Sequence, residues 1–186
     1  MSLDVLEAIE SRRSHRAYQP EKLTQAQLDV LIKAALASPS AVNRQPWHFT
    51  VVQDQDLLSR LNDAVAEDMM SKAEKDRSPR FVDPAYHVFY HAPAVIFISG
   101  EKDFYWSRVD CGIAVENIAL AAEGLGLGSV ILGMPRGAFN TARADEFRQA
   151  LCFPEGYDFV IAIAVGVPAD TKAAHEIKPD RVSFVG

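Results

Sequence analysis

The stretch Pro93-Ala94-Val95-Ile96-Phe97-Ile98-Ser99 (PAVIFIS) is a short apolar run bounded by a proline and a serine. Its length and its β-branched and aromatic residues favour a strand over a helix. A strand that is apolar at every position, rather than at every second one, is typical of a strand buried on both faces. The sequence therefore predicts a central strand with helices packed above and below it.

Three further apolar or β-branched runs predict the neighbouring strands of the same sheet. They are His48–Gln53, Ser129–Leu132 and Phe159–Val165. The tail Arg181–Val185 alternates weakly and is a candidate for one more strand. These runs predict an α+β fold with about four core strands in one sheet, covered by helices on both faces.

Two capping boxes mark the starts of the first helices. Asp4 is followed by Glu7, and Thr24 is followed by Gln27, each at the spacing in which side chain and backbone cap each other. The second helix should end near Pro39. Further helices are expected to start at Asp56, to span Phe104–Leu125 as a central, fully packed helix, and to span Ala142–Leu151.

The composition indicates a globular protein whose ligands are small molecules. The chain has 186 residues, 48% of them hydrophobic, and a net charge of −6. We expect one domain over residues 1–186. The acidic balance argues against a nucleic-acid partner. No secretion signal, membrane span, metal-ligand cluster or disulfide framework is expected from the sequence, which favours a cytoplasmic protein.

The segment Glu10–Tyr18 (ESRRSHRAY) is the most basic part of this acidic chain. Cations at the end of a helix stabilise its dipole, and that is one interpretation of the cluster. The other is an anion site, because guanidinium groups match phosphate oxygens in pairs. Since the cluster follows a helix rather than starting one, such a site has to act through side chains. Both interpretations remain open at this point.

The glycines of Gly124–Gly128 do not form a dinucleotide-binding loop. Their spacing differs from G-x-G-x-x-G, and a helix precedes them while a strand follows. The run instead predicts a helix C-cap. Asp110 and Asn117, on the preceding helix, are interpreted as buried polar groups with local partners. No serine, cysteine or histidine shows the pattern of a nucleophilic hydrolase.

The loop Ser38–Trp47 is unusually rich in polar residues and prolines for a helix-to-strand connection. Its short polar side chains and free backbone donors suit the edge of a planar heteroaromatic ring. An ordinary ordered loop explains the same composition, so the segment alone does not decide between them.

Several motifs occur in a characteristic order along the chain. They are Arg12-Arg13-Ser14-x-Arg16, then Ala37–Phe49 with its Asn43-x-Gln45-Pro46-Trp47, then Ala92-Pro93, Asp110-x-Gly112-x-Ala114-x-Glu116-Asn117, Gly126-Leu127-Gly128-Ser129 and Val165-Gly166-x-Pro168. As an ordered set they resemble the FMN-dependent nitroreductase family. The resemblance covers almost the whole chain, with a gap over about residues 67–91.

The resemblance implies a homodimer of nitroreductase-like fold, with a mostly antiparallel sheet and two FMN sites at the subunit interface. Arg12, Ser14 and Arg16 should hold the phosphate and ribityl chain, and Arg13 the pyrimidine edge. The remaining cofactor contacts that it implies come from a loop of the partner subunit, from the end of a strand near the flavin ring and from cations near the phosphate: Pro39, Ser40, Ala41, Asn43 and Gln45; Leu132 and Gly133; Lys178 and Arg181.

The variable segment, residues 67–91, is expected to border the substrate channel. Its charged first part, Glu67–Arg80, is interpreted as a mobile lid or an exposed hairpin of helices. Aromatic residues in and near the segment are candidates to hold a flat substrate, although each of them suits an ordinary core equally well: Tyr86, Phe89, Tyr90 and Trp106.

The activity that the resemblance implies is a ping-pong transfer. NADH or NADPH would deliver hydride to flavin N5, and a nitroaromatic, quinone or similar acceptor would then take the electrons. The flavin carries this chemistry, so no catalytic side chain is nominated. Two alternatives remain: a specialised flavin enzyme of the same fold (a reductive dehalogenase, a dehydrogenase-type oxidase or a flavin-fragmenting enzyme), or a non-catalytic flavin-binding protein.

Overall fold

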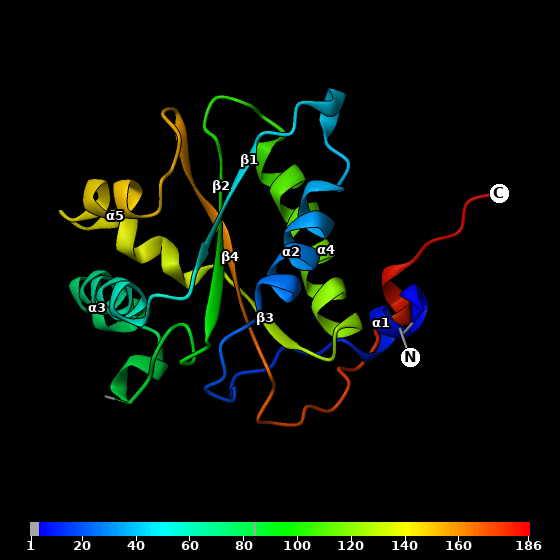
Figure 1. Ribbon diagram of the computed structural model, residues 1–186, viewed down its shortest axis with the longest axis horizontal. Helices are drawn as coiled ribbons and strands as arrows, with labels where there is room; N and C mark the ends of the chain where they lie inside the picture. The colour runs from blue at the N-terminus through cyan, green and yellow to red at the C-terminus, as the bar shows by residue number, and fades with distance from the viewer. Residues whose placement is uncertain (1–3, 84) are drawn as a thin grey trace.

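The computed structural model describes residues 4–83 and 85–186 and is built around one antiparallel sheet (Figure 1). The strand order is β1-β2-β4-β3, and all three pairings are antiparallel. The strands are β1 (Trp47–Val52), β2 (Ala94–Glu101), β3 (Gly128–Leu132) and β4 (Tyr157–Gly166). The predicted α+β class and four core strands are confirmed.

Strand β2 lies between β1 and β4 and is buried at every residue from Ala94 to Gly100. Its side chains alternate between two separate cores. Val95 and Phe97 belong to the core on one face of the sheet. Ile96 and Ile98 belong to the core on the other face. The two-sided burial predicted from PAVIFIS is therefore confirmed.

Helices cover both faces of the sheet, and Figure 1 shows α3 and α5 on one side and α2 and α4 on the other. The α-helices among the described residues are α1 (Val5–Ser11), α2 (Gln25–Leu36), α3 (Gln55–Ser71), α4 (Ser107–Gly124) and α5 (Ala144–Ala150). Short 3₁₀ helices are η1 (Ala41–Asn43), η2 (Glu74–Asp76), η3 (Pro79–Val82), η4 (Met134–Asn140) and η5 (Pro179–Arg181). No helix in the described part of the chain is both long and apolar enough to cross a membrane.

Both predicted capping boxes are present, at Asp4 for α1 and at Thr24 for α2. The predicted start of α3 is shifted. Its cap is Asp54, whose carboxylate accepts from the amides of Asp56 and Leu57, so the helix begins before Asp56. Asp54 was overlooked because two aspartates two residues apart both fit an N-cap position.

Helix α4 begins later than Phe104 and is buried on one face only. Cys111, on the buried face, has no exposed surface, and burial raises the pKa of its thiol to about 12, as befits a small apolar side chain. Val109 and Ile113, on the opposite face, are 52% and 38% exposed. The prediction of a fully packed helix is therefore wrong for the single chain, because no element among the described residues buries Val109 and Ile113.

The helix end after α4 follows the prediction. Gly126 has a φ of +71°, which favours glycine, and the amide of Leu127 donates to the carbonyl of Ala122 at 2.8 Å. This is the hydrogen bond of a Schellman C-cap. It turns the chain directly into β3.

The predicted strand at Arg181–Val185 is not formed. Phe184 and Val185 are 96% and 100% exposed, and no strand pairing includes them. The outer edge of β3 is instead bridged by Ser14, which pairs with Ser129. A weakly alternating segment with no apolar surface to cover gains too little to form a strand.

The variable segment contains no helical hairpin among its described residues. Helix α3 continues to Ser71, and only the 3₁₀ turns η2 and η3 follow. Val88 and Phe89 are fully buried and anchor the end of the segment in the core beneath α3. The charged composition predicted exposure correctly but overestimated the helix content.

His87, in this segment, is half-buried beside His91, with the ring centroids 4.4 Å apart and the ring planes tilted by 32°. Burial and, to a lesser degree, the neighbouring His91 lower the pKa of His87 to about 4, against a small opposing effect of Asp63. Because the unfolded chain binds this proton near pH 6.5, protonation favours unfolding between about pH 6.5 and 4.

We expect the free energy of unfolding to fall as the pH is lowered from 7.5 to 5, with about 1 kcal/mol of the loss due to His87 after allowance for its partial exposure. In the wild-type chain His87 Nδ1 accepts a hydrogen bond from the Phe89 amide at 3.3 Å, and the side-chain oxygen of an asparagine can replace this acceptor. Urea unfolding of His87→Asn at the two pH values should show a correspondingly smaller difference. An unchanged difference would assign the acid sensitivity to other groups.

Candidate functional site

The basic cluster lines a cavity of about 190 Å³ at the start of the chain. The structure thus brings together the side chains predicted to form an anion site. The residues around the cavity are Arg12, Arg13, Ser14, Arg16, Lys172, Ala173 and His175. The last three were not predicted, and they come from the C-terminal segment after β4.

The cluster is held in place by the edge of the sheet. Ser14 bridges Ser129 in parallel, and the His15 amide donates to the Ser129 carbonyl at 3.0 Å. Because side chains alternate in an extended chain, this pairing directs Ser14 and Arg16 away from His15. Arg12 and Arg13, nearer the end of α1, line the same cavity.

Arg13 also stabilises the helix end. Its Nη1 donates to the carbonyls of Glu10 and Arg12, at 2.7 and 2.8 Å. Carbonyls at the end of a helix such as α1 have no partner within the helix, so this side chain supplies one. Arg12 Nε lies 3.5 Å from Glu116 Oε1 on α4. Arg13 therefore contributes to the end of α1, as the helix-end interpretation of ESRRSHRAY predicts, while the side chains of the cluster also line the cavity, so the anion-site interpretation stays a prediction.

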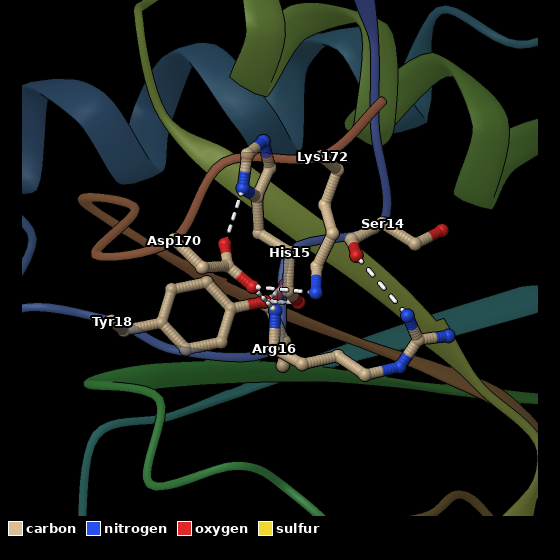
Figure 2. Close-up of polar contacts among 7 residues, drawn as sticks. Ser14, His15, Arg16, Tyr18, Asp170 and Lys172 are labelled. Carbon is tan, nitrogen blue, oxygen red and sulfur yellow. Dashed lines mark hydrogen bonds and ion pairs between the residues drawn. The ribbon is translucent and has the colours of Figure 1, made fainter. Parts of the chain in front are cut away.

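Asp170 fastens the C-terminal segment to the cluster (Figure 2). One of its carboxylate oxygens lies 2.7 Å from His15 Nδ1, and the other accepts from the Arg16 amide at 3.1 Å and lies 3.3 Å from Lys172 Nζ. Partial burial would raise the pKa of Asp170, but these three partners outweigh that effect and hold the pKa below its ordinary value. The carboxylate is therefore charged at neutral pH and keeps Lys172 beside the cavity.

The back of the His15 side chain packs against Gly128 and Pro168. A Cβ added to Gly128 would lie 2.9 Å from His15 Cγ and from Pro168 Cβ, so a larger residue there would displace both. Tyr18 donates to the His15 carbonyl at 2.8 Å, and burial raises the pKa of its phenol, which stays neutral. Gly128 thus leaves the space that the His15 side chain occupies beside the basic cluster.

Lys178 and Arg181 do not line this cavity within the chain. Both are exposed, and Arg181 Nε lies 3.8 Å from the carboxylate of its neighbour Asp180. Lys172 and His175 line the cavity in place of Lys178 and Arg181. No local sequence signal marks them: the bridge between Pro168 and Tyr18, which carries the residues just after Pro168 past the cluster, is a tertiary contact.

The loop predicted to meet a heteroaromatic ring lies at the N-terminal end of α4. Asp110 accepts from the Ala41 amide at 3.2 Å, and Asn117 Nδ2 donates to Ser38 Oγ at 2.8 Å. Asp110 and Asn117 are thus satisfied by this loop and not by local partners, which corrects the sequence interpretation. The two side chains tie the loop to the helix.

The same loop holds several residues in a backbone conformation that favours glycine. Val42, Asn43 and Gln45 have φ values of 51°, 53° and 52°. Such conformations are costly for other residues and concentrate at functional sites. The Gln45 amide donates to Ser40 Oγ at 2.9 Å, and Arg44 forms a bidentate ion pair with Glu101, which together hold the loop in this shape.

The loop and the cavity are far apart in one chain. In Figure 1 the loop runs from α2 to β1 at the top of the view, while α1 lies at the lower right. The five predicted loop residues are therefore not brought to the cluster by this chain: Pro39, Ser40, Ala41, Asn43 and Gln45. A single site that contains both sets of residues requires two chains.

The predicted ring contacts lie at the end of β3. Leu132 is buried, and Gly133 is exposed where the strand ends. Met134 follows, and its Sδ accepts from the phenol of Tyr86 at 3.4 Å. The variable segment thus meets the end of β3.

Tyr86 and Tyr90 form an aromatic wall beside the cavity. Their rings meet edge to face at 5.9 Å, and the guanidinium of Arg16 lies 5.9 Å from the centre of the Tyr90 ring. Arg80, which the sequence interpretation did not single out, donates from Nη1 to Tyr90 Oη at 3.1 Å. Its only sequence signal was its place in a charged stretch.

The other two aromatic candidates lie elsewhere. Phe89 has no exposed surface and packs edge-on against Phe97, so its burial in the core precludes direct contact with a substrate in this conformation. Trp106 is 48% exposed but lies at the start of α4, against Tyr105. It is thus near the loop at the N-terminal end of α4 and not part of the aromatic wall.

Known proteins resemble this chain in structure or in sequence. A nitroreductase with bound FMN from Desulfitobacterium hafniense is 30% identical, with a TM-score of 0.93 and full coverage of both chains. A protein of Archaeoglobus fulgidus, provisionally named an NADH dehydrogenase/NAD(P)H nitroreductase, is 32% identical over 96% of each chain. An iodotyrosine deiodinase of Thermotoga neapolitana is 26% identical over 87% of each chain.

The sequence profile of the nitroreductase family matches residues 9–167, which include the basic cluster, the polar loop and all four strands. The match ends just before Pro168, so the segment that carries Asp170 and Lys172 lies outside it. The chain belongs to the nitroreductase family.

Proposed function

We propose that this protein is an FMN-dependent oxidoreductase that uses NADH or NADPH to reduce nitroaromatics, quinones or similar acceptors. The observation that carries the proposal is the cavity that Arg12, Ser14 and Arg16 line together, with the segment held against the edge of the sheet at Ser14. Relatives of similar length are named as nitroreductases, and one of them holds FMN.

The cavity fits the phosphate end of FMN in charge and chemistry. Its guanidinium and ammonium groups outnumber the carboxylates of Glu116 and Asp170 that pair with them. Guanidinium groups and a serine hydroxyl are suitable donors for phosphate oxygens. Arg13 uses Nη1 for the helix end, which leaves Nε and Nη2 for the pyrimidine edge of the flavin.

When bound, FMN would supply hydride transfer through its ring, and the residues of this chain would position that ring. The Leu132–Gly133 strand end would border the ring on one side. Arg12, Arg16 and Lys172 would neutralise the phosphate. Arg13, at the pyrimidine edge, would favour the reduced, anionic form of the flavin by Coulomb attraction.

The proposed active form is a homodimer. The outer face of α4 carries the exposed Val109 and Ile113, and an added Cβ on Gly112 of the same face would meet nothing within 4 Å. Apolar surface of this kind at a helix face is typical of an interface. A partner packed there would bring its loop of residues 38–45, and its Trp106, toward the cavity of the first chain.

A reductive dehalogenase is the second candidate, favoured by the match to an iodotyrosine deiodinase. One assay separates the two. We expect purified protein to be yellow with a flavin spectrum, anaerobic NADH or NADPH to bleach it, and a nitroaromatic or quinone to restore the colour. Restoration only by a halogenated phenol would favour the dehalogenase, and bound flavin that neither nicotinamide bleaches would rule out the proposed activity.

Replacing Arg16 should weaken FMN binding. Arg16→Ala removes a charged hydrogen bond, so we expect a loss of about 1.5–3 kcal/mol in binding free energy with the fold intact. Quenching of flavin fluorescence measures the dissociation constant, and circular dichroism checks the fold. Lys22→Ala, an exposed cation of the same α1–α2 connection, is the matched control. Equal flavin retention in the two variants would exclude Arg16 from the site.

Disrupting the outer face of α4 should release the flavin. Val109→Glu places a charge in the proposed interface, and we expect monomers that lose FMN on gel filtration. Met70→Glu is the matched control, because Met70 is also 52% exposed but lies on α3, which covers the opposite face of the sheet. Sedimentation recorded at the flavin absorbance gives mass and cofactor together. A Val109→Glu monomer that stays yellow would contradict an interface site.

A further inference from the structure

Arg80 is a cation without a carboxylate partner in a protein with an excess of acids. None of the ion pairs within residues 4–83 and 85–186 includes it. Its side chain is exposed, and its partners are neutral: Nη1 donates to the phenol of Tyr90, and the phenol of Tyr86 also lies against the guanidinium. This leaves most of the guanidinium fork available to a ligand.

The surroundings of Arg80 suit an aromatic ring. Tyr86 meets Tyr90 edge to face at 5.9 Å and Phe81 at 5.0 Å with an interplanar angle of 76°. Edge-to-face clusters present both ring faces and ring edges to a third ring. Arg80 therefore lies at the rim of an aromatic surface.

This surface is joined to both ends of the proposed flavin site. Arg16, a residue of the cavity, lies over Tyr90. Met134, which follows the strand end expected to border the flavin ring, accepts from Tyr86. A molecule packed on the two tyrosines would therefore lie beside both the phosphate end and the ring end of the flavin, with Arg80 at its outer side.

The aromatic surface is held in place by the backbone. Tyr90 and His91 have φ values of 54° and 52°, in the left-handed region. The preceding Val88 and Phe89 are fully buried, and their packing in the core holds the backbone in this conformation. Strain that is maintained in this way is typical of positions where a binding group has to be aimed.

We propose that Arg80 binds a carboxylate on the aromatic molecule that the flavin reduces, while Tyr86 and Tyr90 pack against its ring. The planar fork of the guanidinium matches a carboxylate bidentately, and the tyrosines supply the apolar contact. The acceptor class is thus a flat aromatic acid. The inference rests on the proposed function, because it places the ligand beside the flavin.

A pair of acceptors that differ only in charge tests it. With 4-nitrobenzoate, Arg80→Gln should raise the KM and the dissociation constant from calorimetry at least about tenfold, the usual effect of a lost charged hydrogen bond. With the uncharged 4-nitrobenzamide, both should stay within about twofold by the same reasoning. Arg80→Lys, which keeps the charge but not the fork, should fall between. Calorimetry on the flavin-loaded protein needs no turnover, so it decides the inference even if the proposed activity fails.

Lys75→Gln is the matched control, because Lys75 is an exposed cation of η2 in the same segment. It should leave both ligands unaffected, and an equal effect would mean general attraction by the surface charge. If Arg80→Gln weakened the binding of 4-nitrobenzoate and 4-nitrobenzamide equally, Arg80 would only hold Tyr90 in place and would not bind the carboxylate. A raised KM for NADPH alone, with NADH and 4-nitrobenzoate unchanged, would assign the anion to the donor's phosphate. Each of these outcomes would overturn the inference.

Discussion

Burial of β2 on both faces is the constraint on which the rest of the structure depends. Val95 and Phe97 face one core while Ile96 and Ile98 face the other, so neither face can be left to solvent. Each such side chain contributes about 1.5–3 kcal/mol when buried, against a total stability of about 5–15 kcal/mol for a protein. Helices on both sides of the sheet are therefore obligatory.

The residues of the candidate site lie where this architecture ends. The sheet stops at β3, and its outer edge accepts the extended segment around Ser14. That pairing places the basic residues that follow α1 around one cavity. Because the cluster follows the C-terminal end of α1, the helix dipole would not help to bind an anion there, and the proposed site relies on side chains: several arginines and the lysine that Asp170 holds in place.

Much of the fold was predictable because its signals are local. An apolar strand, two capping boxes and a glycine C-cap each depend on residues within a few positions of one another. Predictions failed where the outcome depended on distant partners. The tail forms no strand and stays exposed, and Asp110 and Asn117 are satisfied by the loop that contains Ser38 and Ala41. The site was predictable in part: the arginines carry a motif, whereas Arg80 and Lys172 carry none.

The sequence by itself determined the fold class, the four core strands and the family, because periodicity and motif order are properties of the chain alone. Only the tertiary structure decided which candidates share a site. It placed Lys172 beside Arg16, removed Phe89 to the core, and separated the loop of residues 38–45 from the basic cluster. The physical reason is that such juxtapositions depend on strand order and on which edge or face remains uncovered, and neither is encoded within any one segment.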